Sequence, residues 1–175
     1  MMLSCLLWLV PLFTKRLPWA ALLLFIRLAR LLYTGIGMKV LLYSTGLPTI
    51  VASLAWVHAD SFPALWYGIV PCSAFALFAF SVSCGADLWF AAVWLLLPLL
   101  GLFGLSGVYA LVRRALCASL VAHMAGAALA VASGATYEWY AYSALVPVER
   151  CIAAAGMVVC AVILDAVQMR KACVA

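Results

Sequence analysis

The residues of this sequence that could do chemistry are polar side chains placed inside or beside long apolar segments. His123 stands in the stretch SLVAHMAG, where an imidazole can bind a ligand, relay a proton or accept a hydrogen bond from a neighbouring helix. Glu149 and Arg150 follow Pro147 at the start of the last apolar block, where they can cap a helix or pair with a solute. Burying such groups is unfavourable unless they are paired, so they are candidates for a functional site. A purely structural role inside a helix bundle remains the alternative for all three.

A second group of candidates lies in the stretch SGATYEWYAYSALVPVER, residues 133–150. Aromatic rings surround the carboxylate of Glu138 there, and they belong to Tyr137, Trp139, Tyr140 and Tyr142. Aromatic faces with a carboxylate are what a small cationic or heteroaromatic solute needs for stacking and charge pairing. Asp87, in the turn CGAD, is expected on the same face of the protein. Aromatic residues also form the ordinary belt at a membrane surface, so the sequence leaves both roles open.

The elements that must position these side chains follow from composition. Of the 175 residues, 70% are apolar and only 9% are charged, and the mean hydropathy is +1.25. A typical soluble domain is about half apolar and about a quarter charged. Too few charged residues remain to cover the surface of a compact soluble fold of this length. The composition therefore predicts a protein that lipid surrounds, and the absence of a polar linker predicts one domain over residues 1–175.

The length of the apolar blocks predicts how the chain crosses the bilayer. A hydrocarbon layer of about 30 Å needs about 20 apolar residues per helix. The blocks lack the alternation of a barrel strand, and helices satisfy their own backbone hydrogen bonds in lipid. We therefore expect an all-α, polytopic transmembrane helix bundle of about six spans. The candidate spans are Leu17–Ile36, Val40–Val57, Phe62–Val82, Leu88–Tyr109, Ala115–Ser133 and Arg150–Val167. Kinks are predicted at Pro48, Pro71 and Pro98.

The distribution of basic residues predicts the orientation of these spans. Basic residues near the ends of spans favour the cytoplasmic side. Six spans with both termini cytoplasmic leave only Lys39 clearly outside. The basic residues then placed inside are Lys15, Arg16, Arg113, Arg114, Arg170 and Lys171. We therefore expect an integral membrane protein of the prokaryotic cell (inner) membrane.

The first span has an open alternative. Arg27 and Arg30 lie three residues apart inside Leu17–Ile36, a pattern that also suits an amphipathic helix lying on the membrane surface. In that case the chain has five spans. The apolar stretch Leu3–Phe13 is expected to stay in the mature chain, because its basic residues follow it, whereas those of a signal peptide come first. Met38 is an alternative start of translation.

The cysteines and the net charge exclude several classes of function. Seven cysteines are scattered without a CxxC pair or metal-ligand spacing, so we expect no metal and no cofactor. Most lie within expected spans, where cysteine acts as a small apolar residue. A disulfide between Cys84 and Cys151, both expected near the outer face, stays open. The flanks of the spans account for the net charge of +5, so lipid is the expected partner and nucleic acid is not.

Two patterns resemble those of intramembrane enzymes. The GLSG motif around Ser106, followed by AHMAG around His123, resembles the GxSG serine and the AH-x-x-G histidine of rhomboid proteases. That family has another whole span between the two, and here only seventeen positions separate them. Cys72, Arg113 and His123 follow the order of the Cys–Arg–His set of exosortase-like transpeptidases, but the six-span topology puts Arg113 on the wrong face. A plainer interpretation of the glycines is a small-residue stripe for close helix packing, made of Gly101, Gly104 and Gly107.

The overall plan resembles the substrate-binding S components of energy-coupling factor transporters. Those are small proteins of about six spans with both termini inside, and they bind vitamin-like ligands near the outer face under extracellular loops. The resemblance implies a transmembrane coupling protein and two ATPase subunits as partners, because the chain has no GxxxxGK[ST] loop of its own. The first span departs from the family, with Arg27 and Arg30 where small residues would help docking.

Three functions follow from these patterns. The first is binding or translocation of a small solute, with a site formed by the loop of residues 133–150, Asp87 and His123. The second is an intramembrane hydrolase or transpeptidase that uses Ser106 and His123, or Cys72 with Arg113 and His123. The third is a non-catalytic membrane scaffold subunit.

Overall fold

The computed structural model describes residues 47–81, 91–104, 106–132 and 146–174, and every regular element within these ranges is a helix. The expected all-α class is therefore confirmed for this part of the chain. The helices are α4 (Leu47–His58), the π-helical η3 (Ala64–Ile69), α5 (Val70–Ser81), the 3₁₀ helix η4 (Val93–Leu95), α7 (Leu96–Gly101), α8 (Gly107–Ala132) and α10 (Val146–Val174).

Two of the described helices are long and apolar enough to cross a membrane. They contain the segments Gly107–Leu129 of α8 and Pro147–Val167 of α10. Only 39% and 22%, respectively, of the most apolar window in each segment is buried by the rest of the chain, whereas the core helix of a soluble protein is mostly buried. Large apolar side chains on α10 such as Ile152, Val159 and Ile163 face outward. The first expected span, residues 17–36, lies outside the described residues.

The boundary between the fourth and fifth expected spans is wrong. The chain leaves α7 after Gly101 and enters α8 at Gly107, whereas the sequence suggested an end at Tyr109 and a start at Ala115. Gly107 has a φ of +59°, a conformation that glycine adopts at little cost, and this allows the chain to reverse there. As a result the paired arginines at 113–114 lie inside α8, in its second turn, rather than in a connecting loop.

The predicted proline kinks take different forms. Pro71 is the second residue of α5, and the helix before it widens into η3, where the N–H of Val70 donates to the carbonyl of Leu65. A π-helical turn of this kind is a common way for a helix to absorb an irregularity. Pro48 and Pro98 lie in the first turns of α4 and α7, where a helix needs no N–H from them.

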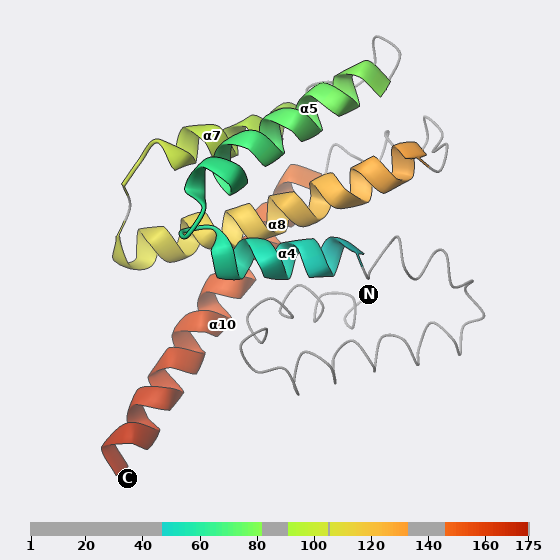
Figure 1. The fold of residues 1–175 in the computed structure, drawn as a ribbon. Coiled ribbons are helices and arrows are strands. Elements are labelled where there is room, and N and C mark those ends of the chain that lie inside the picture. Colours follow the sequence, from blue (N-terminus) through green and yellow to red (C-terminus); the bar gives the residue numbers. More distant parts are fainter. Residues whose placement is uncertain (1–46, 82–90, 105, 133–145, 175) are drawn as a thin grey trace, which may run out of the picture.

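Helix α8 is the centre of the packing. Figure 1 shows it between α4 on one side and α5 with α7 on the other, while the C-terminal half of α10 runs away from the other helices. One face of α8 joins a core cluster with α4, η3, α5, η4 and α7. A second cluster joins α8 to α4 and α10, mostly through alanines packed around Trp56 and Met157. Its buried members are Ala52, Trp56, Ala115, Ala118, Ala154, Met157 and Ala161.

The proposed glycine stripe packs closely at one position only. A Cβ atom on Gly101 would lie 2.7 Å from the Cβ of Tyr67, whereas one on Gly104 would meet nothing within 4 Å. Gly107 serves the turn before α8. The predicted small-residue stripe is therefore seen at Gly101 only, where α7 packs closely against η3, and is wrong for Gly104 and Gly107.

Replacing Gly101 with alanine should destabilise the protein by about 1–3 kcal/mol, because the Cβ of Tyr67 belongs to the stem of a buried side chain and cannot move aside without shifting η3. Thermal unfolding in detergent, followed by circular dichroism, measures the change. The matched control is Gly104→Ala, which should leave the unfolding temperature nearly unchanged. Equal effects of the two substitutions would show that the approach of α7 to Tyr67 is not tight.

Candidate functional site

A cavity of about 600 Å³ lies between α4, α5, η4 and α8. Its volume is within the range of pockets that hold small molecules. Exposed residues such as Leu77 and Ala128 contribute to its wall, so the cavity opens on the surface of the bundle. The lining consists of Val51, Val70, Ser73, Ala74, Leu77, Phe78, Trp94, Val121, Met124, Ala125 and Ala128. Ser73 carries the one hydroxyl group among these described residues.

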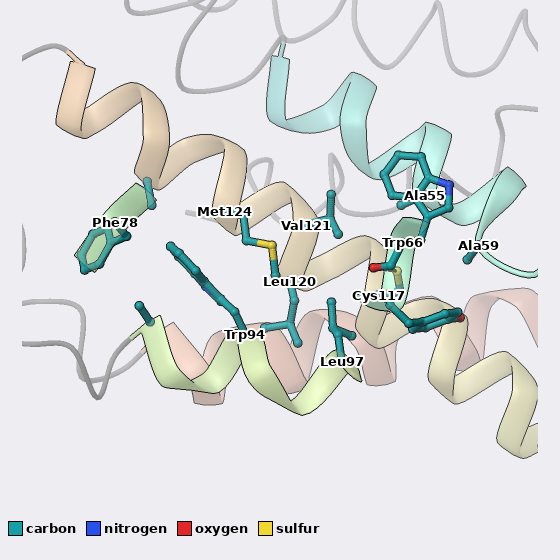
Figure 2. Close-up of a cluster of buried hydrophobic side chains, with 13 residues drawn as sticks. Ala55, Ala59, Trp66, Phe78, Trp94, Leu97, Cys117, Leu120, Val121 and Met124 are labelled. Atoms are coloured by element: carbon teal, nitrogen blue, oxygen red, sulfur yellow. Dashed lines mark hydrogen bonds between the residues drawn. The ribbon is translucent and has the colours of Figure 1, made fainter. Parts of the chain in front are cut away.

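Trp94 is the largest fully buried side chain of the cavity wall. Its side chain is only 1% exposed. The ring meets that of Phe78 edge-on, with centroids 5.5 Å apart and an interplanar angle of 73°. Figure 2 shows the indole lying between Phe78 and the side chains of Leu120 and Met124. An edge-to-face pair of this kind adds stability to that gained by burying its apolar surface, so the ring is held in one orientation.

His123 lies behind this aromatic wall. Its ring is 5.8 Å from that of Trp94, at an interplanar angle of 65°, and it does not line the cavity among the described residues. The hydroxyl of Ser119, one turn earlier on α8, donates to the carbonyl oxygen of Arg150 at 3.0 Å. Arg150 also acts electrostatically on His123. Histidine and arginine, selected separately from the sequence, are therefore neighbours.

The ion pair at the start of α10 lies deeper than expected. The Nη2 atom of Arg150 is 3.6 Å from Glu149, which is in the first turn of the helix as predicted for a cap. The sequence suggested that both residues stand at the outer end of the bundle. Instead, Arg150 packs beside Ser119, at the middle of α8. The small residues Ala118 and Ala154 at this crossing let the two helices approach closely.

Five of the predicted ligand-binding residues lie outside the described residues. They are Asp87, Tyr137, Glu138, Trp139 and Tyr142. The aromatic loop as a cap over a solute therefore stays a prediction. The sequence left a disulfide between Cys84 and Cys151 open; Cys84 also lies outside the described residues, and Cys151 is an exposed, free cysteine.

Neither enzyme-like residue set is brought together. Ser106 directly precedes α8 and His123 is in its fifth turn, so the rise of a helix separates their backbones by about 24 Å. Arg113 and His123 lie on the same helix about 15 Å apart, and Cys72 is exposed on α5. A nucleophile and its base must lie within hydrogen-bond reach. The candidate spans placed Ser106 and His123 on two adjacent helices, which is wrong, because the chain turns before Gly107 and not at the arginines.

A cluster of charged residues forms a second site, which the sequence reasoning missed. Asp60, in the turn between α4 and η3, accepts hydrogen bonds from two arginines of α8. Arg113 Nη2 lies 3.0 Å from Asp60 Oδ1, and Arg114 Nε lies 3.0 Å from Oδ2. The Nη2 atom of Arg114 also donates to Oδ2. Arg113 Nη1 donates to the carbonyl oxygen of Phe103 at 2.8 Å, so the cluster joins two turns of the chain to α8.

Aromatic rings lie under both guanidinium groups of this cluster. Arg113 stands over the ring of Tyr67, 5.0 Å from its centroid, and Arg114 over that of Trp56 at 5.8 Å.

A signal for the cluster was present in the sequence. Asp60 is one of only five acidic residues, and six spans would place it on the same side of the membrane as the two arginines.

The charge of Asp60 is maintained by its partners. Burial by itself raises the pKa of this carboxyl group, but the hydrogen bonds and positive charges of Arg114 and Arg113 outweigh burial and hold the pKa below its usual value. Asp60 is therefore ionised at neutral pH. The cluster of one carboxylate and two guanidinium groups carries one net positive charge.

The sequence matches no protein-family model, and no curated protein or solved structure shows significant similarity to it.

Proposed function

We propose that this protein is a polytopic helical membrane protein that binds a small, largely apolar solute in the cavity between α4, α5 and α8. The observation that carries the proposal is the cavity itself, about 600 Å³ in volume and lined by apolar side chains with a single hydroxyl among the described residues. An apolar wall of this kind favours hydrocarbon or aromatic groups, and Ser73 can orient one polar group of the solute. The apolar outward faces of α8 and α10 support the placement in lipid.

Two expectations from the sequence extend this proposal. One is a location in the inner membrane of a prokaryotic cell. The other is translocation of the solute with the help of a transmembrane coupling protein and ATPase subunits, which rests on the resemblance to S components. Purification from native membranes together with such subunits tests the second.

The hydrolase and scaffold alternatives predict different behaviour of the cavity. The separation of Ser106 from His123 along α8 disfavours a serine hydrolase built on this pair. A scaffold subunit needs no solute, so its cavity should not bind a small apolar probe in a saturable way.

Photolabelling with a phenyl diazirine tests the proposed function. This small apolar probe, added to the protein in lipid nanodiscs, should label peptides that contain Trp94 or Met124, and excess non-photoreactive analogue should suppress this labelling. Ala125→Phe, which places a ring in the cavity, should abolish the suppressible part. The matched control is Ala155→Phe on the exposed face of α10, which should leave it unchanged. Labelling that stays proportional to probe concentration and is insensitive to Ala125→Phe would overturn the proposal.

A further inference from the structure

We propose that Arg114, held in place by Asp60 and Arg113, binds the phosphate of an anionic lipid head group at the membrane surface. The site goes beyond the proposed solute cavity, with which it shares no residue, and it rests only on the placement of the chain in a bilayer. Its chemistry is that of a guanidinium group with a phosphate oxygen, a charge-assisted pair.

The charges of the cluster leave room for an anion. Two guanidinium groups face one carboxylate, so one positive charge is not neutralised by the described residues around it. Arg113 is the buried member, with 12% of its side chain exposed, and Arg114 the accessible one, with 35% exposed. A ligand from outside would therefore meet Arg114.

The hydrogen-bond donors of Arg114 are only partly used. Its Nε and Nη2 atoms donate to Asp60, and its Nη1 atom has no protein partner among the described residues. Arg113 uses Nη1 for the carbonyl of Phe103 and Nη2 for Asp60, and its remaining donor, Nε, is buried and out of reach of a ligand from outside. Asp60 thus fixes the plane of the Arg114 guanidinium group while an edge of it remains available. A pre-oriented guanidinium group loses less entropy on binding a phosphate than a free one.

The surroundings of the cluster favour a lipid over a soluble phosphate. Phe62, Phe103 and Tyr109 come from the same turns and the start of α8, and all three expose much of their side chains. Exposed rings next to a charged group are typical of the interface between head groups and acyl chains. Basic pockets beside spans on the cytoplasmic side are suited to anionic head groups, in agreement with the expected orientation of this end of α8.

Native mass spectrometry of the detergent-solubilised protein tests the site, with phosphatidylglycerol and phosphatidylcholine as probes. We expect preferential binding of phosphatidylglycerol, and a loss of about tenfold in its affinity in Arg114→Gln. Lys171→Gln removes the same charge from the C-terminal end and should change the affinity by less than about twofold. Arg114→Lys should keep part of the affinity, because it keeps the charge but not the fork of donors.

Three outcomes overturn the proposal. The first is a folded Arg114→Gln protein, with an unchanged unfolding temperature, that binds phosphatidylglycerol like the wild type. The second is complete displacement of phosphatidylglycerol by millimolar inorganic phosphate, which would assign the site to free phosphate. The third uses the wild type alone and so applies even if the variant fails to fold. Phosphatidylglycerol with a photocrosslinker in its head group should label wild-type peptides around Asp60 or residues 103–114. Labelling only elsewhere rules the site out. In Arg114→Gln, suppressible diazirine labelling of the cavity should remain as in the wild type. This measurement separates a failure of the lipid site from a failure of the proposed solute cavity.

Discussion

Replacing Trp94 with alanine should lower the free energy of unfolding by about 3–5 kcal/mol, the largest effect we expect from a single substitution. The indole is 1% exposed and contacts both Phe78 and His123 through ring edges. Removing it extends the existing cavity and leaves the facing side chains of α8 without partners, so dispersion energy is lost on both sides. Chemical denaturation in detergent micelles, followed by circular dichroism at helical wavelengths, measures the loss.

A matched control for Trp94→Ala is Leu102→Ala in the turn after α7. Leu102 is 79% exposed, and its truncation should change the free energy of unfolding by less than about 0.5 kcal/mol. If Trp94→Ala costs no more than Leu102→Ala, the aromatic wall between η4 and α8 does not hold these helices together.

Replacing Asp60 with asparagine should lower the free energy of unfolding by about 2 kcal/mol at neutral pH. The substitution keeps the size of the side chain but leaves Arg113, 12% exposed, without its counter-charge. Removing one partner of a fully buried pair costs about 3–5 kcal/mol, and the 35% exposure of Asp60 and Arg114 reduces that figure through solvent screening. Thermal unfolding in detergent at pH 7 measures the difference, and Glu149→Gln, at a carboxylate that is 54% exposed, should cost less than about 1 kcal/mol.

The loss of stability caused by Asp60→Asn should become smaller as the pH falls. The pKa of Asp60 is lower in the folded protein than its ordinary value of 3.8. The unfolded state therefore binds a proton more readily, and the stabilisation by Asp60 is fully present above that value and is lost as the pH falls through the lowered pKa. The wild type and Asp60→Asn should differ by a constant amount from pH 5 upward and converge below about pH 4. A difference that grows on acidification would contradict the charge pairing of Asp60.

The sequence by itself determined the class of the protein. Composition and block length depend only on which residues are present and in what order, and they predicted helices, two of which are long and apolar enough to cross a bilayer. The Pro71 irregularity and the place of Glu149 near the start of the last helix were predictable for the same reason, since each depends on neighbours a few positions away. His123 and Arg150 were selected because polar groups in apolar blocks are costly, and the fold brings them within electrostatic reach.

The tertiary structure alone decided the sites. The cavity is lined from α4, α5, η4 and α8 by side chains that are ordinary apolar residues in the sequence. The pairing of Asp60 with Arg113 and Arg114 spans more than fifty positions, and the turn at Gly107, rather than at the arginines, sets its geometry. The same turn separates Ser106 from His123. Contacts between distant segments depend on how helices pack, and many sequences with the same pattern of apolar and charged residues would pack differently.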